Sequence, residues 1–173
     1  IPKLMLMSLF LTFILTFLLK STNYQFSTFL EYFFVTTAAS ICAASYGTMI
    51  SGCIDSTDLA TTIMAPIELV AMIMAGIFYN LRTLTWLTTI FKYLSIFHYP
   101  HELLSIIHWS KVQKIECDVK GLPCFESGSE VLEEYGYGEE IGGVVVELVG
   151  LTCILYFIGM VGTIRRRIVG SMY

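Results

Sequence analysis

The chain has 173 residues, of which 55% are hydrophobic and 14% charged, and its mean hydropathy is +0.72. The apolar share exceeds that of a typical soluble domain and indicates an integral membrane protein with room for several spans but for no separate soluble domain. The formal net charge of −4 is concentrated in one segment after residue 81, and no basic patch predicts a nucleic-acid partner. The chain opens at Ile1 inside an apolar run without a signal-peptide pattern, so we expect it to be the back part of a longer protein.

Two apolar segments open the chain. Residues 4–19 carry no charge and lie between Lys3 and Lys20, so that the segment 3–20 just reaches spanning length. Residues 32–54 carry no charge either, and they predict a second span at about 30–54. A helix rises about 1.5 Å per residue, and a hydrocarbon core of about 30 Å therefore needs about 20 apolar residues.

Small residues recur at every fourth position of the second span, in two rows. The rows are Ala39, Ala43, Gly47 and Ser51, and Ser40, Ala44, Thr48 and Gly52. Small residues at this spacing let helix backbones approach closely in lipid. We favour packing within the chain over the alternative, a dedicated dimerisation face. The short polar loop 53–58 makes the second and third spans antiparallel, with Asp58 as the expected helix cap.

The third span, 59–81, holds one formal charge, Glu68, and one proline, Pro66. Both are costly in lipid, so this helix is expected to face a bundle interior or a cavity. Glu68 has three interpretations: a polar contact for substrate, a proton-sensitive switch, or a partner for another helix near the cytoplasmic end. We favour the third, because Glu68 lies only ten residues from Asp58.

The apolar segment 86–109 is interrupted by Lys92, three histidines, Pro100 and Glu102. A proline at its centre and this polar content predict a broken helix pair that re-enters the membrane or lies at its interface. The last apolar run, about 143–164, predicts a fourth span.

Charge placement predicts the topology. Lys3 precedes the first span, and Arg165, Arg166 and Arg167 open a tail at 165–173. Because cytoplasmic flanks carry the excess of Lys and Arg, four spans place residues 82–142 outside the cytoplasm. The predicted fold is all-α: a polytopic membrane helical bundle of about four spans plus a re-entrant extracellular helix pair.

The five cysteines divide into two groups. Cys117 and Cys124 lie in the polar segment, where an extracellular compartment permits a disulfide. Cys42, Cys53 and Cys153 lie in or beside apolar spans and are expected to be packing residues. A metal site of Cys and His is disfavoured, because the histidines occupy the broken helix pair without tight ligand spacing. No pattern of nucleophile and base favours an enzyme.

Three phrases resemble the transmembrane domain of the G subfamily of ABC transporters (ABCG, white/scarlet-like). Ala65-Pro66 with residues 74–80, MAGIFYN, is similar to the pattern P…FGGFF.N. Residues 86–104, from Trp86 to Leu104, are similar to W…YLS.F.Y..E.L, and residues 117–132 to C…CP.SG..VL. The phrases occur in the family's order over nearly the whole chain. Three positions depart from the pattern: Ala75 replaces a glycine, Pro100 interrupts the second phrase, and Glu68 occupies a usually apolar position.

The resemblance implies the C-terminal half of an ABC-2 type transmembrane domain, in the plasma membrane or an organelle membrane. It implies a half-transporter, paired with itself or with a second half-transporter, that moves a lipid, sterol, xenobiotic or pigment precursor by alternating access. ATP and Mg²⁺ would belong to a nucleotide-binding domain outside this chain, since no G-x-x-x-x-G-K-[ST] loop occurs here. The alternative is a non-transporting membrane protein, such as a channel subunit or an anchor; no repeated polar face along a span favours it.

The resemblance also implies roles for individual residues. The third span would line the substrate cavity through Met72, Ile73 and Ala75, and Ile77 with Phe78 would form an apolar plug. Whether these side chains instead face lipid or the core stays open. Tyr99 and Glu102 are gating candidates in the broken helix pair. We favour a structural or gating role for Glu102 over substrate contact, and we expect the arginines after residue 164 to fix topology and meet anionic lipid.

Overall fold

The computed structural model of the chain describes residues 2–19, 26–77, 86–115, 125–138 and 140–170. Within these ranges the chain is helical and contains no strand, so the all-α prediction is confirmed. The elements follow in the order α1 (Pro2–Leu19), α2 (Phe26–Cys53), α3 (Thr57–Met72), η1 (Ile73–Ile77), α4 (Trp86–Leu94), α5 (His98–Trp109), α6 (Gly128–Tyr135) and α7 (Ile141–Gly170).

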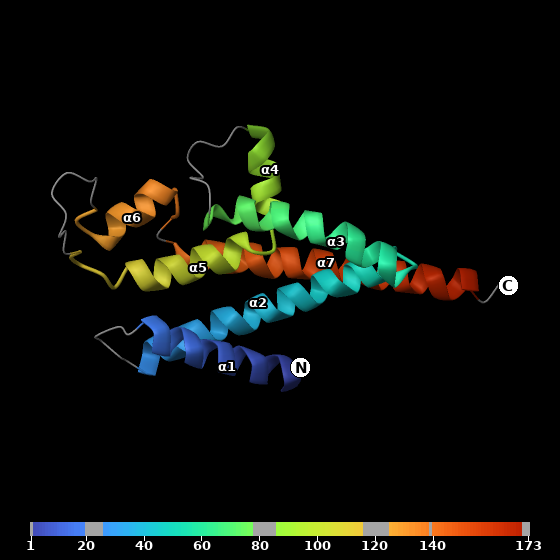
Figure 1. Ribbon diagram of the computed structural model, residues 1–173, viewed down its shortest axis with the longest axis horizontal. Helices are drawn as coiled ribbons and strands as arrows, with labels where there is room; N and C mark the ends of the chain where they lie inside the picture. Colours follow the sequence, from blue (N-terminus) through green and yellow to red (C-terminus); the bar gives the residue numbers. More distant parts are fainter. Residues whose placement is uncertain (1, 20–25, 78–85, 116–124, 139, 171–173) are drawn as a thin grey trace.

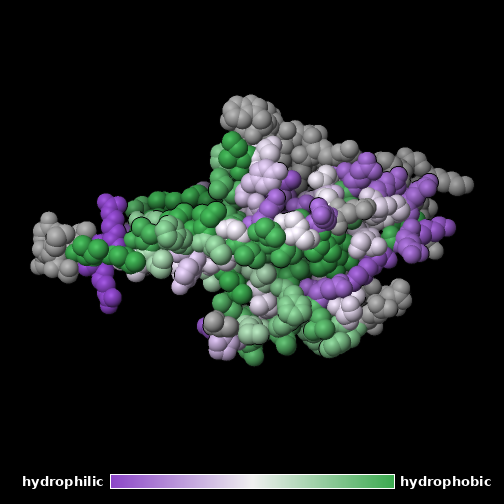
Figure 2. Space-filling model, turned by 180° about the vertical axis from the view of Figure 1, so that it is seen from behind, coloured by the Kyte–Doolittle hydropathy of each residue, from purple (hydrophilic) through white to green (hydrophobic). Residues whose placement is uncertain are grey.

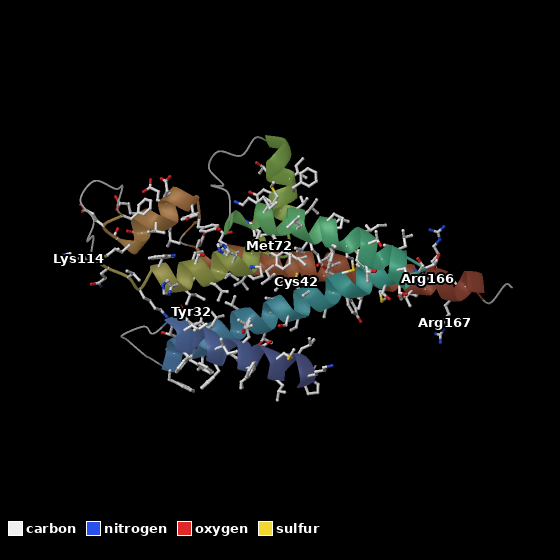
Figure 3. The ribbon with its side chains drawn as sticks, viewed as in Figure 1. Tyr32, Cys42, Met72, Lys114, Arg166 and Arg167 are labelled. Carbon is white, nitrogen blue, oxygen red and sulfur yellow. The ribbon has the colours of Figure 1, made fainter. Side chains whose placement is uncertain are left out.

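The long helices α1, α2, α3 and α7 run roughly along the long axis, α5 and α6 lie at one end, and α4 stands beside α3 nearer the middle (Figure 1). α2 and α7 run in one direction, while α1 and α3 run in the opposite direction. We call the end that carries α5 and α6 the α5 end. The opposite end, where Arg166 and Arg167 lie (Figure 3), is the arginine end. α3 therefore ends, and α7 begins, at the α5 end.

Three of the described helices are long and apolar enough to cross a membrane: Phe26–Cys53, Thr57–Gly76 and Ile141–Ile168. The apolar helix Pro2–Leu18 is shorter. Many large apolar side chains on these helices are exposed, and Figure 2 shows hydrophobic residues over the middle of the molecule and hydrophilic ones at its two ends. This distribution suits a bilayer core between two polar interfaces.

α2 and α7 form the tightest helix pair, because glycines remove side chains where their backbones meet. A Cβ added at Gly52 would lie 2.5 Å from the carbonyl oxygen of Gly159, and one at Gly162 would lie 2.6 Å from that of Gly52. Such contacts exclude any side chain at these positions. The favoured interpretation, packing within the chain, is confirmed at Gly52, whereas Ala44 of the same row is exposed. A Cβ at Gly47, in the other row, would have no atom within 4 Å.

α1 is joined to α2 by hydroxyl groups. The Thr12 and Thr36 hydroxyls lie 2.8 Å apart, and those of Ser8 and Ser40 lie 3.0 Å apart. Ser8 and Thr12 are buried to 1% and 0% exposure, although α1 is otherwise widely exposed and apolar. In lipid, such interhelical hydrogen bonds supply part of the association that water would otherwise drive.

The N-cap of α3 lies two residues before the one expected from the sequence. The Ser56 hydroxyl accepts a hydrogen bond from the Leu59 amide at 3.2 Å, so Ser56 is the N-cap and Asp58 lies in the first turn. The expectation that Asp58 caps this helix was wrong; its carboxylate instead lies in the positive field of the helix start. Pro66 lies inside α3, and the helix continues past it to Met72.

The end of α3 unwinds into η1, a turn of π-helix over Ile73–Ile77. Within it Gly76 has φ 93° and ψ 3°, in the left-handed region that side chains disfavour. The glycine that remains from the pattern FGG is therefore the residue that permits the turn.

The broken helix pair is present, as predicted, in α4 and α5. The break lies at residues 95–97 and not at Pro100, which is the third residue of α5. The expectation that the proline itself interrupts the segment was wrong, because a proline is tolerated in the first turn, where its missing N–H would have no helical partner. α7 likewise continues to Gly170, so the arginines of the predicted tail lie in its last turns, where cations favour a helix.

Candidate functional site

At the α5 end, one chain of hydrogen bonds joins three elements. The Tyr137 hydroxyl, just beyond α6, donates to the Ala75 carbonyl oxygen in η1 at 3.2 Å. The same hydroxyl lies 2.8 Å from Nδ1 of His101 on α5. Since the hydroxyl has a single proton and donates it to the carbonyl, it accepts from His101, whose Nδ1 therefore carries the hydrogen. We call this the His101–Tyr137–Ala75 chain.

Burial keeps both side chains of this chain neutral. It lowers the pKa of His101, with a further lowering by His98 and a smaller opposing effect of Glu102. Burial also raises the pKa of Tyr137, and the nearby Glu102 and Tyr135 raise it further. With Nδ1 protonated and the ring neutral, Nε2 of His101 carries a lone pair.

A second polar pair lies one turn away on α5. Nε2 of His98 lies 3.2 Å from a carboxylate oxygen of Glu102, and the side chains are only 1% and 9% exposed. Nδ1 of His98 is buried without a hydrogen-bond partner among the described residues. Glu102 is therefore paired with a histidine of its own helix.

Two more hydroxyls fasten this region to α3 and α4. The Ser95 hydroxyl, in the break, donates to the Ala71 carbonyl oxygen at 2.6 Å. The Tyr99 hydroxyl donates to the Tyr93 carbonyl oxygen at 2.9 Å, and burial together with nearby acidic groups raises the pKa of Tyr99 to about 12. Carbonyls at the end of α3 and in η1 are thus held from both the break between α4 and α5 and the segment after α6.

The far end of α5 is fixed to the start of α2. The Tyr32 hydroxyl lies 3.2 Å from Nδ1 of His108. Lys111, just past α5, donates to the Thr28 hydroxyl at 2.9 Å and pairs with Glu31. Tyr32 lies at the α5 end of α2 (Figure 3). α5 is thus attached to α2 at this end and, through Tyr137, to η1 nearer its start.

Two cavities flank η1. The first, the α5–α6 cavity, has a volume of about 460 Å³. It is lined by Gly76, His101, Ser105, Trp109, Ile115, Phe125, Val131, Leu132, Tyr135 and Tyr137. The second, the α3–α4 groove, has a volume of about 480 Å³ and is almost entirely apolar. It is lined by Pro66, Ile67, Val70, Ala71, Met74, Phe91, Leu94 and Ser95.

The residues proposed for the cavity wall do not share one environment. Met72 and Ile73 are 38% and 36% exposed on a face that lines neither cavity. Ala75 is fully buried, and it contributes its carbonyl to the hydrogen-bond chain. Glu68 is half-buried on α3 and lines neither cavity.

The remaining candidates divide between the described and undescribed residues. Tyr99 and Glu102 are both buried on the inner side of α5. Ile77 ends η1, but its side chain, and the whole of Phe78, lie outside the described residues. Cys117 and Cys124 lie outside them too, so the disulfide stays a prediction.

His98, His101 and Tyr137 were not among the predicted site residues. The sequence carried a signal for the first two, because positions 98, 101 and 102 fall on one face of a helix. For Tyr137 there was none, since its partners are 36 and 62 residues away in the chain. In the described part of the chain, no group of three or more metal-ligating side chains is assembled.

Comparison with known proteins gives one family match and several similar proteins. Residues 1–109 match the family model described as "ABC-2 type transporter". The chain is similar to "Protein brown" of Drosophila melanogaster, with 29% identity over 151 residues, and to "Protein scarlet" of the same fly, with 30% identity over 155 residues. Each alignment covers 86% of this chain but only 22% of the relative. "Protein white" of Drosophila melanogaster is 28% identical over 123 residues, 70% of this chain and 18% of its own length.

Proposed function

Because this chain belongs to the ABC-2 type transporter family and is an integral membrane protein, we propose that it forms the membrane-spanning part of an ATP-driven half-transporter. Its cargo is a hydrophobic or amphipathic small molecule, such as a lipid, sterol, xenobiotic or pigment precursor, moved by alternating access. The α5 end faces away from the cytoplasm, and the arginine end faces the cytoplasm, in line with the excess of basic residues there.

The observation that supports this proposal is the structure of the last turns of α3 at the α5 end, where an apolar face meets a turn held by other elements. One face of the helix there is apolar and partly exposed, and it includes Met72 and Ile73. The carbonyls of its last turns are held by side chains of other elements. An exposed apolar wall that ends in a fastened, unwound turn is suited to open and close around an apolar cargo.

The partner is a second half-transporter, either a copy of this protein or a related chain, and membrane lipid covers the remaining apolar surface. A cavity for cargo would form between two copies of α3, with Ile77 and Phe78 as its apolar constriction. ATP and Mg²⁺ act in a nucleotide-binding domain of the full-length protein. No segment of this chain has a phosphate-binding loop, and no step of ATP chemistry is assigned to its residues.

Reconstitution tests the proposal. The full-length protein, placed in lipid vesicles, is expected to move a fluorescent sterol or the amphipathic dye rhodamine 123 only when MgATP is present. Ile73→Trp, which narrows the wall on α3, is expected to reduce this movement several-fold. Val146→Trp is the matched control, because Val146 is an exposed apolar residue near the same end of α7. Movement without MgATP, or equal loss in the two variants, would contradict the proposal.

A further inference from the structure

The α5–α6 cavity has the composition of a small-molecule site. Its volume of about 460 Å³ lies within the usual range for ligand pockets, which are mostly apolar with a few placed polar groups. Among the described residues that line it, none is Lys, Arg, Asp or Glu. A charged ligand would lose hydration there without gaining a countercharge, so the cavity favours a neutral one.

The walls favour a planar ligand. Four aromatic side chains line the cavity: Trp109, Phe125, Tyr135 and Tyr137. The Tyr135 and Tyr137 rings are stacked, with an interplanar angle of 11° and centroids 6.1 Å apart. Parallel ring faces at the edge of a cavity can extend their stack to a flat aromatic guest.

The polar groups favour a ligand that donates a hydrogen bond. His101 lines the cavity, and its Nδ1 is engaged by Tyr137, so its Nε2 is a bare acceptor without a partner among the described residues. One turn further along α5, the Ser105 hydroxyl also lines the cavity and makes no hydrogen bond to any described residue. Nε2 of His101 and the Ser105 hydroxyl therefore both lack a hydrogen-bond partner among the described residues, and they lie between aromatic walls. A ligand with a hydrogen-bond donor could bond to them.

We propose that the α5–α6 cavity binds a neutral, planar aromatic molecule whose O–H or N–H group donates a hydrogen bond to Nε2 of His101. The site is separate from the exposed face of α3, and binding to it does not depend on transport. Because Gly76 of η1 forms part of the wall, the ligand contacts the same turn that the His101–Tyr137–Ala75 chain holds.

A matched pair of probes tests the proposal. 2-Naphthol offers a two-ring aromatic body and one O–H donor, and 2-methoxynaphthalene has the same rings without a donor. Binding is measured by equilibrium dialysis with the full-length protein in lipid nanodiscs, after subtraction of the uptake by empty nanodiscs. We expect 2-naphthol to bind at least tenfold more tightly than its ether.

Variants assign the site. His101→Phe is expected to remove the preference for 2-naphthol, because the acceptor is lost while the aromatic lining remains. Ser105→Phe is expected to fill the cavity and weaken both probes at least tenfold, and it leaves His101 and Tyr137 in place. Val70→Trp, which fills the α3–α4 groove, is the matched control and is expected to leave both affinities unchanged.

The outcomes separate the proposal from its alternatives. A preference for 2-naphthol that survives His101→Phe would overturn it, as would loss of binding in Val70→Trp with retention in Ser105→Phe. If His101→Phe lowers the melting temperature of the protein, binding is compared at a temperature at which both the variant and the parent protein are folded. Transport by a protein that binds neither probe would overturn this inference and leave the proposed function intact.

Discussion

The Tyr137 hydroxyl donates a hydrogen bond of 3.2 Å to the Ala75 carbonyl oxygen, which ties the segment after α6 to the unwound end of α3. Both residues are buried, Tyr137 to 7% and Ala75 to 0% exposure. The carbonyl belongs to a π-turn, where the regular helical pattern of hydrogen bonds is interrupted. A side chain remote in sequence thus supports a backbone group at the point where the proposed wall of the cargo cavity ends.

Tyr137→Phe removes this support. The change leaves the Ala75 carbonyl and Nδ1 of His101 without their partner, and unsatisfied buried groups cost about 1 to 3 kcal/mol. We expect the free energy of unfolding to fall by that amount and MgATP-dependent transport to decrease. The measurements are steric-trapping or thermal unfolding of the full-length protein in nanodiscs, followed by vesicle transport.

Tyr135→Phe is the control for this prediction. Its ring stacks on Tyr137 but, at 38% exposure, lies nearer the surface, and its hydroxyl makes no hydrogen bond to a described residue. We expect a change below about 0.5 kcal/mol, as for a surface substitution. Equal destabilisation by the two variants would show that the hydroxyl of Tyr137 is not the supporting group.

The two rows of small residues on α2 lead to a second prediction. Gly52→Ala places a methyl group against the Gly159 backbone, so α2 and α7 must separate, and we expect a loss of about 1 to 3 kcal/mol. Gly47→Ala meets no atom within 4 Å and is expected to stabilise the helix by about 0.5 to 1 kcal/mol.

The free energy of unfolding of each variant in nanodiscs distinguishes the two positions. The sign of the Gly47→Ala effect also tests whether this row packs against a second copy. If that substitution destabilises the assembled protein but not the separated protomer, the exposed row packs against a second copy. The dimerisation interpretation would then hold for the row that contains Gly47.

Adjacent threonines on α2 give a third prediction. The Thr36 hydroxyl is buried and bonds to Thr12 of α1, whereas the Thr37 hydroxyl is buried without a partner among the described residues. Thr36→Val is expected to destabilise the protein by about 0.6 kcal/mol, the average for interhelical hydrogen bonds in membranes, and by no more than about 1.7 kcal/mol. Thr37→Val removes an unsatisfied group at constant shape, so it is expected to be neutral or stabilising. If Thr37→Val destabilised the protein more than Thr36→Val in unfolding experiments, the packing of α1 against the Thr36 side of α2 would be refuted.

Much of the fold was predictable because apolar length and small-residue spacing act locally. The apolar segments 32–54 and 59–81 predicted α2 and α3, and the close approach at Gly52 followed from its place in a small-residue row. The resemblance to white/scarlet-like transporters is confirmed by the family match and by the similarity to scarlet and white. The number of membrane crossings stays a prediction.

The site was less predictable, because its chemistry depends on tertiary contacts. The sequence singled out Tyr99 and Glu102 but not Tyr137, whose role arises only when the segment after α6 meets η1. The histidines were considered as polar content and as metal ligands, but not as partners of Glu102, although their spacing places His98 beside Glu102 on one helix. The break was wrongly placed at Pro100. A helix tolerates a proline in its first turn, so the prediction depends on where α5 begins. Hydrogen bonds of Ser95 with Phe97 and His98 set that start at His98.

The last prediction concerns pH. Burial lowers the pKa of both His101 and His108 below the ordinary value of 6.5. Between 6.5 and these lowered values the unfolded chain binds more protons than the folded one, so the free energy of unfolding falls as the pH falls through this window. The groups that act on His101 are His98, which lowers its pKa further, and Glu102, which opposes the shift. The α5 end is therefore expected to lose stability in mildly acidic solution, first where His101 bonds to Tyr137 and His108 to Tyr32.

The double variant His101→Gln, His108→Gln isolates this effect, because His98 is then the only histidine left in the chain. Glutamine cannot take up a proton in this range, while its amide can still bond to the two tyrosines. Melting temperatures of the full-length protein and the double variant are compared at pH 7.5, 6.5 and 5.5. We expect the parent protein to lose more stability than the variant between pH 6.5 and 5.5. A difference between them that stays constant over this range, or that shifts in favour of the parent protein at pH 5.5, would mean that the two imidazoles are not held neutral by burial.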